Sequence, residues 1–132
     1  MQYTSIIDYF SPSSREECLT TRRMAAPLDN NNGLESIVSS SYRRAPFIAF
    51  ITICMDEKKV KELEIIPNSL RSLRKASSSD VLNWLLKNHV ELIVIPLTDK
   101  DLLSVVEKSG TPFLLIDPGL ILSEVLEIAF KA

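Results

Sequence analysis

Residues 47–66 read FIAFITICMDEKKVKELEII, and this stretch decides the fold. Phe47 to Cys54 is a nearly continuous apolar run, which is typical of a buried strand. Residues 55–58 (MDEK) predict a turn, and Val60 to Ile66 alternates well enough between apolar and polar side chains to predict a second strand. Together they predict an antiparallel hairpin that Pro67-Asn68 ends.

Downstream of the hairpin, helical patterns alternate with short apolar strands. Serines at 77–79 followed by Asp80 predict a helix start, and Asn88 is expected to close that helix in the left-handed conformation. Residues 90–95 (VELIVI) predict a buried parallel strand. The remaining expected elements are a helix capped by Thr98 and ended by Gly110, a strand at 113–116 and a last helix after residues 117–119. A hairpin followed by this alternation implies an α/β domain with a mixed, mostly parallel sheet and helices packed on it.

Upstream of the hairpin, residues 19–28 predict a first strand, which Pro27 and the polar turn at 29–33 end. Residues 1–18 show no clear period and combine aromatic side chains with a Ser-Pro-Ser-Ser turn. The chain is therefore expected to comprise an N-terminal extension, residues 1–18, and one domain, residues 19–132.

Composition excludes several classes of protein. The net charge is −2, so no overall positive field would attract nucleic acid. No apolar run approaches the length of a membrane span, and the N-terminus lacks the pattern of a secretory signal. Cys18 and Cys54 have neither CxxC spacing nor a partner cluster, so we expect both to be reduced thiols in a cytoplasmic protein.

The sequence also lacks the residues of a familiar active site. Its one histidine, His89, lies at a predicted helix end and has no second ligand nearby in sequence. The acids that follow predicted strands, Asp29 and Asp117, are explained as turn residues, and three glycines are too few for a phosphate-binding loop. We therefore expect a protein that is not an enzyme.

Two basic clusters are candidates for binding an anion. Arg43-Arg44 comes just before the strand at 47–54, and Arg71, Arg74 and Lys75 lie in the segment between the hairpin and the first helix. Guanidinium groups in such loops bind anions, although solvated loop charges are the more ordinary explanation.

The stretch from Ala26 to Phe50 resembles the dinitrogenase iron–molybdenum cofactor family, nitrogenase accessory proteins that bind or insert the cofactor or its precursor. The family pattern is Pro-x-Asp followed by Gly-Leu-Asp-Ser-x-Val-Ser-x-His-Phe-Gly-Arg-Ala-Pro. The residues that match it are Pro27, Asp29, Gly33, Leu34, Ser36, Val38, Ser39, Arg44, Ala45 and Pro46. The order of elements continues the resemblance over residues 23–130, which implies a ribonuclease H-like motif with a five-stranded mixed sheet.

The departures from the family pattern fall on its functional position. The family histidine, a candidate cluster ligand, is replaced by Ser41, and the glycine two residues later is replaced by Arg43. A hydroxyl is a poorer ligand for iron or molybdenum than imidazole or thiolate. The cofactor-binding residues that the resemblance and the basic clusters together indicate are Asp29, Asn31, Ser41, Tyr42, Arg43, Arg44, Arg71 and Arg74.

Three functional hypotheses follow. The favoured one is a non-enzymatic carrier or insertion accessory protein for an iron–molybdenum or iron–sulfur precursor cluster, with a degenerate cluster site. The rival is a divergent scaffold that binds a protein partner, such as a member of a cofactor-assembly pathway, or a small anion. A nuclease of the ribonuclease H type comes third. An uncovered sheet edge would support a homodimer.

Overall fold

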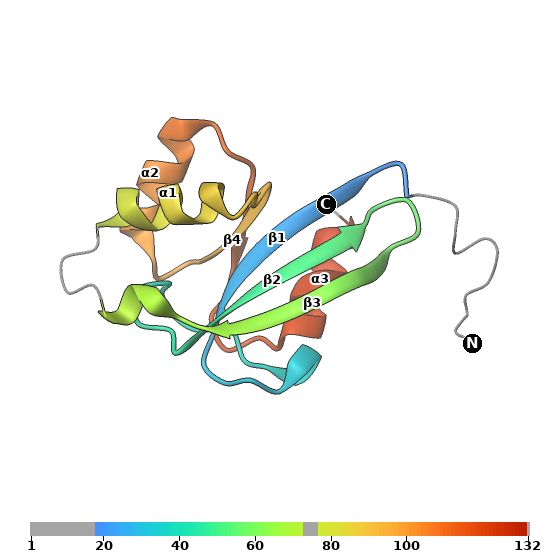
Figure 1. Cartoon of the computed structure of the whole chain (residues 1–132), viewed down its shortest axis with the longest axis horizontal. Helices are drawn as coiled ribbons and strands as arrows, with labels where there is room; N and C mark the ends of the chain where they lie inside the picture. The colour runs from blue at the N-terminus through green and yellow to red at the C-terminus, as the bar shows by residue number, and fades with distance from the viewer. Residues whose placement is uncertain (1–17, 73–76, 132) are drawn as a thin grey trace.

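The computed structural model of the chain describes residues 18–72 and 77–131, with the backbone alone at 71 and 72 (Figure 1). Of the predicted N-terminal extension, only Cys18 lies within the described part. The elements in chain order are β1 (Thr21–Leu28), η2 (Gly33–Glu35), β2 (Phe47–Cys54), β3 (Lys59–Pro67), η3 (Ser69–Ser72), α1 (Ser78–Lys87), β4 (Leu92–Pro96), α2 (Lys100–Ser109), β5 (Phe113–Ile116) and α3 (Leu122–Lys131).

The five strands form one mixed sheet in the order β3-β2-β1-β4-β5. β2 and β3 form the predicted antiparallel hairpin, and β2 is also antiparallel to β1, with Leu28 opposite Phe47 and Thr21 opposite Cys54. β4 is parallel to β1 and to β5. The expectation of an α/β domain built on a mixed sheet is confirmed.

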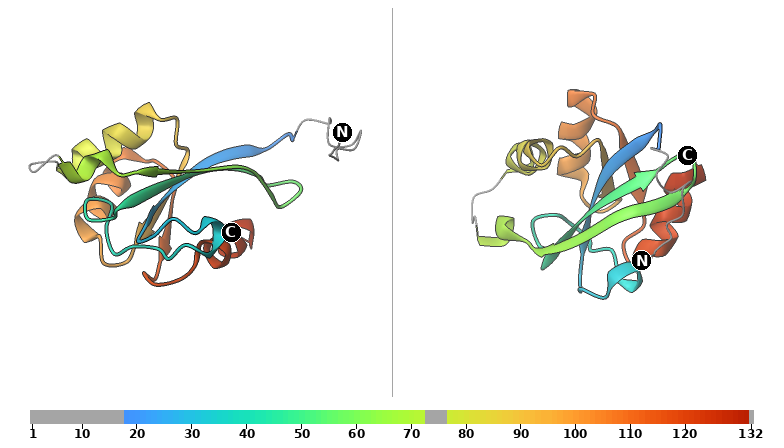
Figure 2. Two further views of the ribbon diagram at one scale, coloured as in Figure 1. Left: turned by 60° about the horizontal axis from the view of Figure 1, so that its bottom comes forward. Right: turned by 45° about the vertical axis from the view of Figure 1, so that its right-hand side comes forward.

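Helices cover both faces of the sheet, so the core has two halves (Figures 1 and 2). The side chains of Ala25, Phe50 and Ile93 pack on the face that α1 and α2 cover. Their neighbours in the strands, such as Ala26 and Ile51, pack on the opposite face against α3. Because alternate residues of a strand point to opposite faces, strands buried on both sides read as the continuous apolar runs seen in the sequence.

The helix ends agree only partly with the predictions from sequence. Ser77 caps α1 in a capping box with Asp80, as expected, and Gly110 ends α2 with a φ of 77°. The left-handed residue after α1 is His89, with a φ of 64°, whereas Asn88 has a φ of −92°. Thr98 does not cap α2, because its hydroxyl donates to the Ser40 carbonyl and Asp99 occupies the cap position. The predictions for Asn88 and Thr98 were therefore wrong.

The two cysteines form a disulfide, which corrects the expectation of reduced thiols. Their Cα atoms lie 5.8 Å apart although 36 residues separate them in sequence. The antiparallel register accounts for the pairing, because it sets Thr21 opposite Cys54 and so brings Cys18 close to the end of β2. Disulfides persist mainly in oxidising surroundings, so the cysteines no longer support the predicted cytoplasmic location. That location stays a prediction.

Among the described helices, none has the length and apolar character that crossing a membrane requires.

Candidate functional site

The candidate site lies where the parallel strands β1 and β4 end. From the end of β1 the chain turns to β2 on one side, whereas from the end of β4 it passes through α2 to β5 on the other. In open α/β sheets, ligands bind in the crevice outside the strand ends at such a point of divergence. The connection from β1 to β2, residues 29–46, covers this edge.

The first half of this connection, residues 29–38, is directed toward α3. The Asp29 N–H donates to the Ile37 carbonyl at 2.8 Å, and the Asn30 side chain accepts from the Ile37 N–H at 2.8 Å. The Leu122 N–H donates to the Ser36 carbonyl at 2.8 Å, which connects this half to α3. Asp29 and Asn31 are exposed on it.

The second half, residues 39–46, is hereafter the arginine loop, and Tyr42 anchors it to the sheet. The Tyr42 ring is fully buried among the side chains beneath α1 and α2. Its hydroxyl donates to the Ala25 carbonyl of β1 at 2.8 Å. Burial, together with the nearby Asp99 carboxylate, raises the pKa of Tyr42 well above its ordinary value. The phenol therefore stays protonated at neutral pH, where it serves as a hydrogen-bond donor.

Polar side chains from other elements fix the backbone of the arginine loop. The Asn68 amide is buried and donates to the carbonyls of Tyr42 and Ala45 at 2.6 and 2.8 Å. The Asp99 carboxylate accepts from the Tyr42 N–H at 3.1 Å, and the Thr98 hydroxyl donates to the Ser40 carbonyl at 2.6 Å. With so many contacts to the sheet and to α2, this loop is a preorganised feature of the surface.

Arg43 and Arg44 project from this fixed loop as exposed side chains. Ser41, on the same loop, is half-buried, and its hydroxyl accepts from the Arg44 N–H at 3.2 Å. Asp99 is half-buried, and this burial raises the pKa of its carboxyl, while the hydrogen bonds it accepts and the Arg43 charge act in the opposite direction. The exposed part of the loop thus presents two guanidinium groups, and the half-buried Asp99 carboxyl interacts electrostatically with that of Arg43.

The predicted site residues are brought together only in part. Ser41, Tyr42, Arg43 and Arg44 are consecutive on the arginine loop, but Tyr42 offers no side-chain atom to a ligand at the surface because it is buried. Asp29 and Asn31 belong to the half of the connection that is bonded toward α3.

The second basic cluster is described less completely. Arg71 lies in η3, and η3 begins directly after the buried Asn68 that holds the arginine loop. The side chain of Arg71 is outside the described part. Arg74 lies outside the described residues. Their expected role in binding stays a prediction.

Three residues that organise the site were not predicted from sequence. Asn68 was assigned only the end of a strand, Thr98 was assigned a helix cap, and Asp99 was assigned no role at this site. Each acts on a loop that lies at least 23 residues away in sequence. The one local signal was an Asn directly after a strand-ending Pro, a position at which the side chain commonly bonds to nearby backbone.

The donor atoms of the arginine loop do not suit direct coordination of iron or molybdenum. Residues 39–46 contain no cysteine or histidine, and the one hydroxyl at the family's ligand position already accepts from Arg44. Both cysteines and His89 lie at the end of the sheet opposite the arginine loop, namely before β1, at the end of β2 and before β4. The loop does suit an anion, because guanidinium groups form paired, charge-assisted hydrogen bonds with oxyanions and other negative groups.

Comparison with known proteins supports the fold. No protein-family model matches the chain, and no curated protein matches its sequence. The fold is similar to that of PH0822, whose crystal structure gives a TM-score of 0.64 at 17% identity over 83% of this chain and 89% of that chain. The apo form of the orange protein (ORP) from Desulfovibrio gigas gives 0.63 at 14% identity, over 83% of this chain and 88% of that one.

A third similar structure is that of TM1290 from Thermotoga, which carries the provisional name NifB and belongs to the DUF35 family. It gives a TM-score of 0.54 at 19% identity, over 83% of this chain and 87% of that one. At such identities these likenesses establish the arrangement of strands and helices and carry no residue assignment.

Proposed function

We propose that the chain is a non-enzymatic binding protein whose arginine loop holds an anionic ligand through Arg43 and Arg44. The observation that carries the proposal is a pair of exposed arginines on a loop whose backbone is held by Tyr42, Asn68 and Asp99. A preformed loop binds with a smaller loss of conformational entropy than a loop that must be ordered by its ligand.

The favoured ligand is an anionic metal–sulfur cofactor or its precursor. Two lines of support lead to it: the motif that ends in Arg44-Ala45-Pro46 resembles the iron–molybdenum cofactor family, and one protein of similar fold carries the name NifB. Membership of that family, and the ribonuclease H-like description of the sheet, are part of this proposal. The cluster would be held by charge and hydrogen bonds to guanidinium groups, without a protein ligand to its metals.

A small oxyanion is the second candidate ligand. The observation that favours it is the type of donor on the loop, since guanidinium groups and a hydroxyl suit phosphate or molybdate as well as a cluster. The protein would then retain the family scaffold without its cluster-binding function.

The test compares three anions on the anaerobically purified protein. Tetrathiomolybdate serves as the metal–sulfur probe, and molybdate and phosphate serve as the oxyanions, with binding followed by equilibrium dialysis and visible absorption. Each hydrogen bond to a charged group contributes about 1.5–3 kcal/mol, so Arg43→Gln and Arg44→Gln should each weaken binding roughly 10-fold or more.

A matched control carries the same change in net charge elsewhere. Arg22 and Lys87 are both exposed, and they lie at the start of β1 and the end of α1, away from the arginine loop. Arg22→Gln and Lys87→Gln, made as single substitutions, should each leave binding unchanged. Preference for tetrathiomolybdate supports a cluster carrier, and preference for an oxyanion supports the second candidate. Binding of none of the three, or equal weakening in the control, contradicts the proposal.

A further inference from the structure

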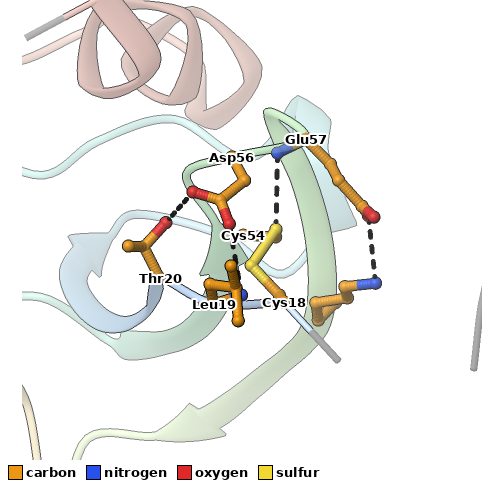
Figure 3. The surroundings of a disulfide bond; sticks show 7 residues. Cys18, Leu19, Thr20, Cys54, Asp56 and Glu57 are labelled. Atoms are coloured by element: carbon orange, nitrogen blue, oxygen red, sulfur yellow. Dashed lines mark hydrogen bonds and ion pairs between the residues drawn. A yellow bond between two sulfur atoms is a disulfide. The ribbon is translucent and has the colours of Figure 1, made fainter. Parts of the chain in front are cut away.

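A second group of ligand-type side chains lies at the end of the sheet opposite the arginine loop. It consists of the disulfide-bonded Cys18 and Cys54 and the carboxylate of Asp56 (Figure 3). The sulfur atoms and a carboxylate oxygen all lie within 4.8 Å of one another. This site is separate from the one proposed above and does not depend on it.

The backbone of β1 and β2 brings these side chains together. The Met55 N–H donates to the Thr20 carbonyl at 2.9 Å, which continues the antiparallel pairing beyond the strand ends. The Asp56 carboxylate accepts from the Leu19 N–H at 3.2 Å and from the Thr20 hydroxyl, so it is directed back toward the Cys18 segment (Figure 3). The position of Asp56 is thus set by backbone as well as by the disulfide.

The sulfur of Cys54 has an additional polar contact. The Glu57 N–H donates to Cys54 Sγ at 3.4 Å. A backbone N–H directed at a sulfur stabilises a thiolate there, and such outer contacts orient the ligands of metal sites and tune their affinity. This contact needs no rearrangement if the disulfide opens.

We propose that reduction of the Cys18–Cys54 disulfide turns this group into a metal site of the zinc type. A dithiol supplies two electrons and two protons: its sulfurs become a disulfide and the protein gains two thiols. The metal ion then displaces both thiol protons to solvent and binds the two thiolates and the Asp56 carboxylate. Water completes the coordination, as it does in zinc sites with three protein ligands.

The geometry suits such a site. Zinc lies about 2.3 Å from thiolate sulfur and about 2.0–2.2 Å from carboxylate oxygen, which places tetrahedral ligand atoms roughly 3–4 Å apart. Opening the disulfide lets the sulfurs separate to that spacing through rotation of Cys18, which is only half-buried. Cys54 is fully buried whereas Asp56 is exposed, so the metal would enter from the Asp56 side.

Two sulfurs distinguish this group from ordinary surface carboxylates. Exposed acidic groups bind divalent ions weakly, whereas paired thiolates select zinc and related soft ions over magnesium or calcium. Zinc would also keep the thiols from forming the disulfide again, because the metal occupies the electron pairs that attack in thiol–disulfide exchange. Reduction followed by metal binding would therefore replace the disulfide that joins the start of β1 to the end of β2 with a metal ion that joins the same two segments.

The test titrates cobalt(II), a spectroscopic substitute for zinc, into the full chain with and without prior reduction by a dithiol that is then removed. We expect the reduced protein to bind stoichiometric cobalt with sulfur-to-cobalt charge-transfer and tetrahedral d–d absorption, and zinc to displace it. The oxidised protein should show neither band. Cys18→Ser should abolish the charge-transfer band under reducing conditions, with circular dichroism used to verify the fold.

Asp56→Asn tests the carboxylate, and Glu64→Gln, at an exposed carboxylate of β3 opposite Phe50, is its control. Loss of a ligand should weaken cobalt binding at least about 10-fold, since even partners outside the ligand set account for 10–100-fold. Glu64→Gln makes the same change in charge and should bind as the native protein does. The proposal fails if the reduced, folded protein shows no charge-transfer band, if Cys18→Ser retains it, or if Asp56→Asn and Glu64→Gln weaken binding equally.

Discussion

Asp99 is the residue whose ionisation is most closely tied to the arginine loop. Its carboxylate accepts from the Tyr42 N–H, yet its half-buried position raises the pKa of the carboxyl. A raised pKa means that the folded state favours the protonated form. The contribution of Asp99 to stability is therefore fully present below the ordinary value of 3.8 and is lost as the pH rises through the raised pKa of the folded state.

Asp99→Asn should remove this pH dependence. The amide oxygen can still accept from the Tyr42 N–H, whereas the burial of a charge is eliminated. We expect the free energy of unfolding of the variant minus that of the native protein to increase from pH 4 to pH 7, because only the native protein loses stability over this range. Urea denaturation at the two pH values measures it. A difference that stays constant or reverses would contradict the assignment of burial as the main cause.

Tyr42 shows how a residue predicted for a site can serve it indirectly. Its ring is buried and its hydroxyl is used within the fold, so its contribution is to hold the neighbouring Arg43 and Arg44 in position. The family pattern also has an aromatic residue at this position, but only the packing shows that the Tyr42 ring belongs to the core.

At the scale of elements, α1 depends on the cap at its start. The Ser77 hydroxyl accepts from the Asp80 N–H at 3.1 Å, and the Asp80 carboxylate accepts from the Ser77 N–H at 2.9 Å. This second bond is the chief cause of the lowered pKa of Asp80. The helix is short, so local bonds at its start contribute a large part of its stability.

Ser77→Ala should destabilise the protein by about 1 kcal/mol, the usual effect of losing a helix cap. Thermal and urea unfolding measure the loss. Ser79→Ala, in the first turn of the same helix, is the control and should change stability less. Equal effects of the two substitutions would show that the Ser77 cap has no special role.

For the whole molecule, the disulfide is the longest-range covalent constraint in the described part of the chain. It joins residues 36 positions apart and connects the start of β1 to the end of β2. A crosslink of this span restricts the unfolded chain and stabilises the folded state by roughly 3–4 kcal/mol.

Reduction should therefore lower the free energy of unfolding by roughly that amount in the absence of metal ions. Urea denaturation of the native protein with and without a dithiol gives the difference. In Cys18→Ser the dithiol should have no effect, which separates loss of the crosslink from other actions of the reductant. A native protein that is equally stable in both conditions would contradict a stabilising disulfide.

The sequence by itself determined the elements whose signals are local. It predicted β2 and β5 at their observed bounds, the hairpin, a helix start at serines 77–79 and a helix end at Gly110, because each depends on residues within a few positions of one another. The class of fold followed from the order of these elements. At the candidate site, it identified Arg43 and Arg44 from their charge and from the motif around them.

The tertiary structure alone decided what depends on register and packing. The disulfide, the burial of Tyr42 and the bonds from Asn68 and Asp99 to the arginine loop join residues 17 to 57 positions apart. No local pattern encodes such pairs, since they arise only when β1 is set between β2 and β4. The physical reason is that local periodicity specifies which face of an element is buried, whereas the partner of each side chain is specified by how the elements are aligned.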